Sequence, residues 1–161
     1  MVIVIMGAAG AGKTTVGRAL AEVLGWAFCD ADALHAPASI LKMRNGVPLT
    51  EEDRGPWLER VRAMMADFVA DGRSAVVACS ALRAAYRAIL RQIPGEVRFV
   101  HLDATPELLR DRVGRRSDHF APVELISSQL ATLEPPDDAV VLDASQPVEL
   151  LVAAIRAALS V

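Results

Sequence analysis

The sequence IVIMGAAGAGKTTVGRAL, residues 3–20, decides the fold. An apolar run typical of a buried strand, Val2–Met6, stops at Gly7, a loop of small residues follows, and a helical pattern then covers Val16–Leu24. The loop has the form G-x-x-x-x-G-K-[ST], filled by Gly7, Gly12, Lys13 and Thr14. Placed between a strand and a helix, this motif predicts a phosphate-binding loop.

The chemistry of the loop follows from its small residues. Glycine and alanine let the backbone curl so that successive N–H groups point into one concavity, to which the dipole of the following helix adds positive potential. In this motif the lysine reaches the β- and γ-phosphates, and the hydroxyl after it is available to Mg²⁺. The alternative is an ordinary glycine-rich turn, which the strand and helix on either side argue against. We therefore predict nucleoside triphosphate binding by Gly7, Ala8, Ala9, Gly10, Ala11, Gly12, Lys13, Thr14 and Thr15.

Size, charge and cysteine content narrow the class of protein. The 161 residues make one domain, 1–161, and the 53% apolar and 23% charged fractions are typical of a soluble globular chain. A net charge of −3 gives no electrostatic reason to expect nucleic acid or an anionic membrane as partner. Cys29 and Cys79 are too few for a disulfide framework or a metal site and are expected in the core. Because no signal peptide or membrane-spanning run is apparent, we expect a cytoplasmic protein with reduced thiols.

The remaining apolar runs predict a parallel sheet. Runs of strand length recur, and they are continuous rather than alternating, which is typical of strands buried on both faces by helices. They lie at Val2–Met6, Ala75–Cys79, Val97–Leu102 and Ala139–Leu142, with a weaker one at Trp26–Cys29. We therefore expect an α/β fold of three layers, with about five parallel strands flanked by helices and joined by right-handed crossovers.

Helix ends can be read from capping residues and proline. A helix over Leu34–Asn45 is expected to end at Asn45-Gly46. Thr50 can cap a first turn with Asp53 in the capping-box position, and Pro56 is expected to open a new helix, which puts Asp53 and Arg54 at a junction between helical pieces. Two apolar stripes are expected in the core: Trp57, Val61, Met64, Met65 and Phe68 in one helix, and Val148, Leu151, Val152, Ile155 and Leu159 in the last.

Two aspartates follow the second predicted strand, in the segment CDADALH. Ligands of open parallel sheets bind beyond the carboxyl ends of the strands. Asp30 and Asp32 alternate along an extended segment, so one can organise hydrated Mg²⁺ while the other accepts a hydroxyl proton. The alternative, turn-forming residues with a helix cap, is disfavoured beside a phosphate loop.

An arginine cluster in RDRVGRRSDHF is open to two interpretations. Arg110, Arg112, Arg115 and Arg116 either form a solvated basic end of a helix or belong to a mobile lid that closes over the transferring phosphoryl group. The spacing alone leaves both open. His101, within an apolar strand, is expected to be structural.

Four segments taken together resemble a known family. GAAGAGKTT, DADALHAPASILKMRNGVPLTEEDRGPWL, CSALRAAYR and HFAPVELISSQLATLEPP resemble the bacterial-type gluconokinases, which are small P-loop kinases, and the match runs in order from residue 1 to about 137. The resemblance implies ATP- and Mg²⁺-dependent phosphorylation of D-gluconate at its 6-hydroxyl. It also implies a P-loop kinase fold with a helical substrate-binding segment, about residues 33–72, and a lid, about 114–122.

The resemblance further implies site roles at matching positions. The implied catalytic residues are Lys13, Asp30, Asp32, Arg112 and Arg115. Thr14 and Asp30 would serve the metal. The implied substrate-binding residues are Asp32, His35, Arg54, Arg83, Arg87 and His119, an arginine-rich set suited to a carboxylate substrate.

Several positions depart from the family pattern. Ala31 replaces the glycine of D-G-D, and Ala9 and Ala11 stand where serines are frequent. Ala36, Ser39 and Asp118 also differ, the first two within the substrate segment, so ATP binding is better founded than gluconate specificity. Two other functions stay open: a kinase for another polyhydroxylated acid such as shikimate, and an ATP-binding sensor without catalysis. The sequence leaves the oligomeric state, monomer or homodimer, open.

Overall fold

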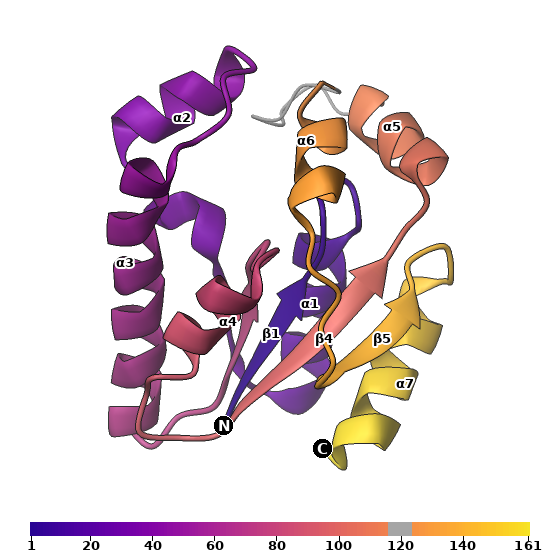
Figure 1. Ribbon diagram of the computed structural model, residues 1–161. Coiled ribbons are helices and arrows are strands. Elements are labelled where there is room, and N and C mark those ends of the chain that lie inside the picture. The colour runs from indigo at the N-terminus through magenta and orange to yellow at the C-terminus, as the bar shows by residue number, and fades with distance from the viewer. Residues whose placement is uncertain (116–123) are drawn as a thin grey trace.

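A five-stranded parallel sheet forms the centre of the computed structural model, which describes residues 1–115 and 124–161 (Figure 1). The strand order is β2-β3-β1-β4-β5, and every neighbouring pair is parallel. The strands are β1 (Val2–Met6), β2 (Ala27–Asp30), β3 (Ala75–Ala78), β4 (Val97–Asp103) and β5 (Ala139–Asp143). The predicted sheet is confirmed, with each strand within one residue of its expected bounds at either end.

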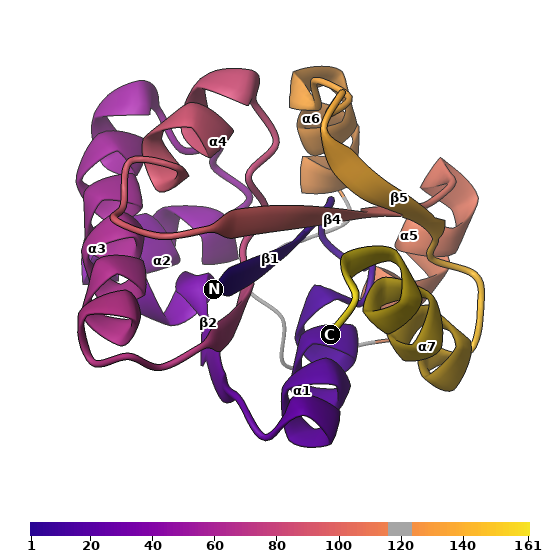
Figure 2. The same cartoon turned by 90° about the horizontal axis from the view of Figure 1, so that it is seen from below.

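Helices cover both faces of the sheet. They are α1 (Lys13–Leu24), the 3-10 turn η1 (Ala31–Leu34), α2 (Pro37–Arg44), α3 (Glu51–Ala70), α4 (Ala84–Leu90), α5 (Pro106–Gly114), α6 (Glu124–Thr132) and α7 (Val148–Leu159). Seen from below, α3 and α4 lie on one side of the sheet and α1 and α7 on the other, which gives the three expected layers (Figure 2). Among the described residues, none of these helices has the length and apolarity needed to cross a membrane.

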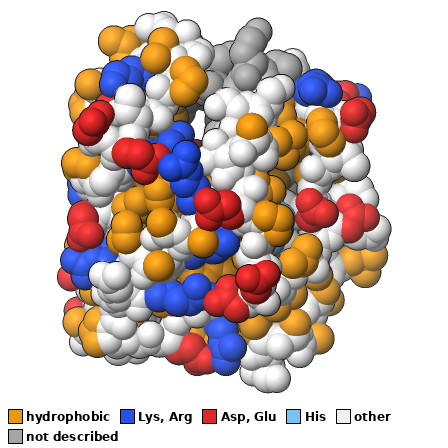
Figure 3. Space-filling model, viewed as in Figure 1, with side chains coloured by type: hydrophobic (Ala, Val, Ile, Leu, Met, Phe, Trp, Pro, Cys, Tyr) orange, Lys and Arg blue, Asp and Glu red, His pale blue; other side chains and the backbone are white. Residues whose placement is uncertain are grey.

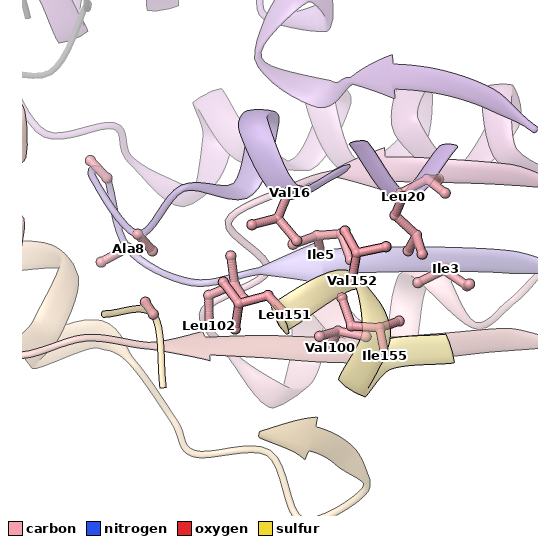
Figure 4. Packing of buried hydrophobic residues seen from close by; sticks show 14 of the residues in the cluster. Ile3, Ile5, Ala8, Val16, Leu20, Val100, Leu102, Leu151, Val152 and Ile155 are labelled. Atoms are coloured by element: carbon pink, nitrogen blue, oxygen red, sulfur yellow. The ribbon is translucent and has the colours of Figure 1, made fainter. Parts of the chain in front are cut away.

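The two cores meet at β1, whose five residues are all fully buried. On one face, Ile3 and Ile5 of β1 pack with Leu20 of α1 and with Val152 and Ile155 of α7 (Figure 4). On the other face, the alternate residues of β1 pack against the buried stripe of α3, which is Trp57, Leu58, Val61 and Met65. Burial from both sides explains why this strand is apolar at every position. Each predicted stripe is buried at three of its five positions, whereas Val148 and Leu159 of α7 and Met64 and Phe68 of α3 are only half-buried.

The predicted helix over Leu34–Asn45 is wrong at its start. Ala31–Leu34 forms a 3-10 turn, and α2 begins only at Pro37. Proline forces the residue before it out of the helical region, and Ala36 is accordingly extended, with φ −63° and ψ 148°. The helix end is as expected, because Asn45 is the C-cap and Gly46 follows with φ +71°.

The predicted break before Pro56 is also wrong. α3 is continuous from Glu51, so Asp53 and Arg54 lie in its first turn rather than at a junction. Pro56 removes only the hydrogen bond that the Glu52 carbonyl would accept, and Glu52 is exposed, so water can replace that bond. The capping box is confirmed: Asp53 Oδ2 accepts from the Thr50 N–H at 2.9 Å, and Thr50 Oγ1 accepts from the Asp53 N–H at 3.3 Å.

The fold gathers the loops that follow the strands at one edge of the sheet. The phosphate loop joins β1 to α1 at this edge, close to α6, while both chain termini lie at the opposite end (Figure 1). Of the predicted lid, about residues 114–122, only Gly114 and Arg115 fall within the described residues.

Candidate active site

The phosphate loop has the backbone that its glycines permit. Gly7, Gly10 and Gly12 have φ values of +140°, +88° and +101°, which residues other than glycine rarely adopt. At Gly7 a Cβ would also lie 2.8 Å from the Leu102 carbonyl oxygen. Lys13 Nζ donates to the Ala8 carbonyl oxygen at 3.0 Å, so the ammonium lies over the loop. Since α1 begins at Lys13 without acidic residues in its first turn, the loop and the helix N-terminus form a cradle suited to phosphate.

Thr14 and Asp30 meet beside this cradle. Thr14 Oγ1 donates to Asp30 Oδ2 at 2.8 Å, and the other carboxylate oxygen accepts from the Asp32 N–H at 3.1 Å. A hydroxyl and a carboxylate are oxygen ligands of the kind that Mg²⁺ prefers, with phosphates and water completing the shell. The described residues contain no cluster of three or more His, Cys, Asp or Glu side chains that could hold a metal alone. The pair therefore fits a metal that is held jointly with a nucleotide.

A cavity of about 80 Å³, here the acceptor cavity, opens beside the loop between α3 and α6. Figure 3 shows the molecule hollowed at its upper edge and, on the face shown, charged side chains of both signs interspersed. The cavity brings together five site residues predicted from the sequence, which are Ala9, Lys13, Asp32, His35 and Arg54. Its other polar walls come from Ser80, Tyr86, Ser128, Gln129 and Thr132.

His35 is held against Trp57 at the cavity wall. The two rings stack with centroids 4.4 Å apart and planes 9° from parallel, and Trp57 Nε1 donates to the Ala31 carbonyl oxygen at 2.8 Å. Burial lowers the pKa of His35, although the charge of Asp32 opposes this shift. His35 Nδ1 is buried and has no hydrogen-bond partner among the described residues. A neutral imidazole at the cavity wall can donate one hydrogen bond and accept another, although the Nδ1 atom itself is shielded from solvent.

Three donors converge on one carboxylate oxygen at the outer end of the cavity. Glu51 Oε1 accepts from Tyr86 Oη at 2.7 Å, from Arg83 at 3.0 Å and from Arg54 at 3.4 Å. We call Glu51, Arg54, Arg83 and Tyr86 the Glu51 cluster. The tyrosine hydrogen bond, and after it the two guanidinium charges, hold the pKa of Glu51 below its usual range. Burial of Tyr86, and then its bond to Glu51, raise the tyrosine pKa.

Arg87 lies apart from this cluster. Its side chain is buried and donates to the carbonyl oxygens of Ala81, at 3.1 Å, and Leu82, at 3.3 Å. Arg87 does not line the acceptor cavity. Its contacts stabilise the loop after β3, where Ala81 has φ +43°.

A second cavity, of about 300 Å³, lies on the other side of the phosphate loop; we call it the nucleotide cavity. Gly12 and Thr15 of the loop region line it, together with Arg112 and Arg115. Arg112 donates to the Ala11 carbonyl oxygen at 3.3 Å, which connects α5 to the phosphate loop. Arg115 is more exposed and pairs with Asp111 at 2.9 Å. His119 lies outside the described residues.

Sequence reasoning missed the contribution of α6. Gln129 Oε1 accepts from the N–H of Ala9, in the phosphate loop, at 2.7 Å. Ser128 and Thr132 of the same helix also line the acceptor cavity. The polar spacing of residues 128, 129 and 132 on one helix face was the signal that could have found this wall.

Comparison with known proteins gives concordant results. Residues 2–136 match the model of a family described as AAA domain. A gluconokinase of Gluconobacter oxydans is 48% identical over 136 residues, which cover 84% of this chain and 76% of that protein. A crystal structure of a gluconokinase from Sinorhizobium meliloti is 41% identical with a TM-score of 0.87, covering 98% of this chain and 90% of that chain. An unliganded sugar kinase from Janibacter is 42% identical with a TM-score of 0.92, covering 99% and 94%.

A more distant similarity concerns the alternative acceptor. A shikimate kinase from Aquifex aeolicus is 20% identical with a TM-score of 0.61, covering 99% of this chain and 96% of that chain. At this identity the likeness shows a shared fold alone.

Proposed function

The chain belongs to the gluconokinase family, and we propose that it transfers the γ-phosphoryl group of ATP to the 6-hydroxyl of D-gluconate. The observation that carries this proposal is the placement of one loop between two cavities. Lys13 lines the acceptor cavity, while Gly12 and Thr15 line the nucleotide cavity. A phosphoryl group held by the loop therefore faces both the molecule that gives it and the molecule that receives it.

In the proposed reaction Asp32 acts on the acceptor hydroxyl. Asp32 lines the acceptor cavity, whereas Asp30 is engaged with Thr14 and the Asp32 backbone. Asp32 accepts the proton of the 6-hydroxyl while the hydroxyl oxygen forms a bond to the γ-phosphorus. The bond between the γ-phosphorus and the β–γ bridging oxygen breaks at the same time, and ADP is released. Asp30 remains to orient the metal side of the site.

Charge on the transferring group is stabilised by Lys13 and by the loop N–H groups. Thr14 and Asp30 would hold Mg²⁺, which when bound neutralises charge on the β- and γ-phosphates. Arg112 and Arg115 line the nucleotide cavity, and we propose that they approach the phosphates when both substrates are bound.

The acceptor is bound from its two ends in this proposal. Arg54 and Arg83 supply the charge that a carboxylate needs, and the His35 ring lines the cavity where a hydroxyl of the acceptor would lie. Arg87 supports binding indirectly, by holding the loop at Ala81 and Leu82. His119 is proposed as a further substrate contact on the strength of the family motif. ATP as phosphoryl donor also makes the cytoplasm the proposed compartment.

An assay of ADP release across a panel of sugar acids and shikimate tests the function. We expect D-gluconate to give the highest kcat/KM, with 6-phosphogluconate as product. Faster turnover of shikimate than of gluconate would mean that the natural acceptor is another polyhydroxylated acid. If ATP binds but no acceptor supports ADP release, the chain is a sensor and the proposed reaction is wrong.

A further inference from the structure

The Glu51 cluster resembles an anion-binding site that the protein fills with its own side chain. Two guanidinium groups and one phenol hydroxyl donate to a single oxygen of Glu51. Such a convergence of charged donors is the usual way in which proteins bind a carboxylate. Two of the donors, on Arg54 and Tyr86, also line the acceptor cavity.

The donors are positioned independently of Glu51. Tyr86, a residue of α4, is 5% exposed and belongs to the same core cluster as the buried residues of α3. The guanidinium carbons of Arg54 and Arg83 lie 5.9 and 5.8 Å from the centre of its ring. Cation–π attraction to a fixed ring therefore keeps both arginines in place when their carboxylate partner changes.

The Glu51 side chain, in contrast, can rotate away from its three donors. Its side chain is 59% exposed, and Glu51 is the first residue of α3. Glu52 and Asp53 remain in the same turn to complement the helix dipole, and the cap at Thr50 does not involve Glu51. Rotation of this one side chain into water costs no core packing.

We propose that the Glu51 carboxylate occupies, in the empty protein, the position at which the carboxylate of the acceptor binds, so that a sugar acid must displace Glu51 to bind. This inference rests on the proposed function. Two carboxylates in one site repel each other, so the acceptor and Glu51 compete for the same donors. Glu51 thereby sets the affinity for anionic acceptors, and it leaves a neutral polyol, which brings no carboxylate, unaffected.

The test compares Glu51→Gln and Glu51→Ala with the matched control Glu52→Gln. All three changes remove one negative charge from the first turn of α3, but Glu52 forms no ion pair with a described residue. We expect KM for gluconate to fall about fivefold in the Glu51 variants, because the competing carboxylate is gone. We expect kcat to change less than about twofold, because the change affects binding of the ground state and the transition state equally and the reacting hydroxyl is at the far end of the cavity. The inhibition constant of D-glucitol, the neutral polyol probe, should not change in any variant.

The inference is overturned if KM rises or stays constant in both Glu51 variants, since Glu51 would then order the arginines instead of competing. It is also overturned if Glu52→Gln lowers KM to the same extent, or if the affinity for D-glucitol shifts in parallel. Thermal unfolding of each variant verifies that the fold is retained. A wild-type protein that does not phosphorylate gluconate refutes the proposed function, whereas an active wild type with unresponsive Glu51 variants refutes this inference alone.

Discussion

At the scale of single residues, the aspartate that ends β2, Asp30, and the one that follows it, Asp32, differ in what surrounds them. Asp30 is fixed by Thr14 and by the Asp32 backbone, whereas the Asp32 side chain lines the acceptor cavity. One residue between them, Ala31, is fully buried and accepts the Trp57 indole N–H. The extended segment that the sequence suggested is wrong here, because Ala31–Leu34 forms a 3-10 turn with Asp30 as its N-cap. The turn nevertheless gives the two carboxylates different surroundings, which agrees with the proposed metal-side role of Asp30 and acceptor-side role of Asp32.

Replacing each aspartate by asparagine tests this division, because the change keeps the shape but removes charge and basicity. We expect Asp30→Asn to lower kcat and to raise the Mg²⁺ concentration needed for half-maximal rate. Asp32→Asn should lower kcat and weaken gluconate binding together. The measurement is a titration of rate against gluconate and Mg²⁺. Wild-type behaviour of both variants would make the two residues turn formers.

Lys13→Met tests the phosphate loop itself. In the proposed reaction the lysine ammonium stabilises charge that develops on the transferring phosphoryl group, so we expect kcat to fall by about 10³-fold or more. Circular dichroism and the unfolding temperature should remain close to those of the wild type, because Lys13 is partly exposed. Turnover near the wild-type rate would remove Lys13 from the mechanism.

At the scale of elements, α6 supplies a wall of the acceptor cavity and a contact to the phosphate loop. The Ala9 N–H can only donate, so the Gln129 oxygen must be its partner, which fixes the orientation of the amide. This bond joins residues 120 positions apart in the chain. No local pattern in the sequence encodes it.

Gln129→Met keeps the approximate size of the side chain but removes the acceptor. We expect kcat to fall about tenfold and the free energy of unfolding to fall by about 1 kcal/mol, because a partly buried N–H loses its partner. Gln92→Met is the control, since Gln92 is exposed and lines neither cavity. Equal kinetics for the two variants would show that the Ala9 contact has no part in turnover.

The elements also show where local sequence rules reach their limit. The capping box at Thr50 was predictable because it involves residues three apart. The predicted break at Pro56 was wrong because a proline removes only one helical hydrogen bond. Packing of Trp57 and Leu58 in the core offsets that loss. The start of α2 was misread because the effect of Pro37 on Ala36 was not considered.

At the scale of the whole molecule, the strands and the phosphate loop could be predicted, whereas the strand order and the Glu51 cluster could not. β1 and β3 are both apolar and buried at every residue, so this pattern does not tell which of them is central, and the strand order depends on the crossovers. Glu51 and Tyr86 meet only because α3 and α4 pack side by side on one face (Figure 2). The sequence alone offers no sign of that contact.

The two described histidines make the stability of the whole fold sensitive to mild acid. Burial lowers the pKa of His101 and of His35 below the ordinary value. The unfolded chain therefore takes up protons first, so stability is complete above about pH 6.5 and declines as the pH falls from there towards the folded pKa values. Glu51 acts in the same direction but in a lower pH window: its lowered pKa adds stability that is lost only at more acidic pH.

Urea unfolding at pH 7.5 and 5.5 measures this effect. We expect a lower midpoint at the acidic pH, with about 1 kcal/mol lost for each unit by which a histidine pKa is lowered. His101→Gln should reduce the difference between the two pH values. An unchanged difference in that variant would exclude His101 as a source of the acid sensitivity.

The stacked pair of Trp57 and His35 gives the molecule an intrinsic optical reporter. An indole ring held against an imidazole at a cavity wall changes its fluorescence when a bound molecule alters the polarity or protonation of its neighbour. The other tryptophan, Trp26, packs with the core on the opposite face of the sheet, so a Trp26→Phe variant isolates the signal. Occupancy of the acceptor cavity can then be followed by emission in the absence of ATP, which separates the binding of a sugar acid from its conversion.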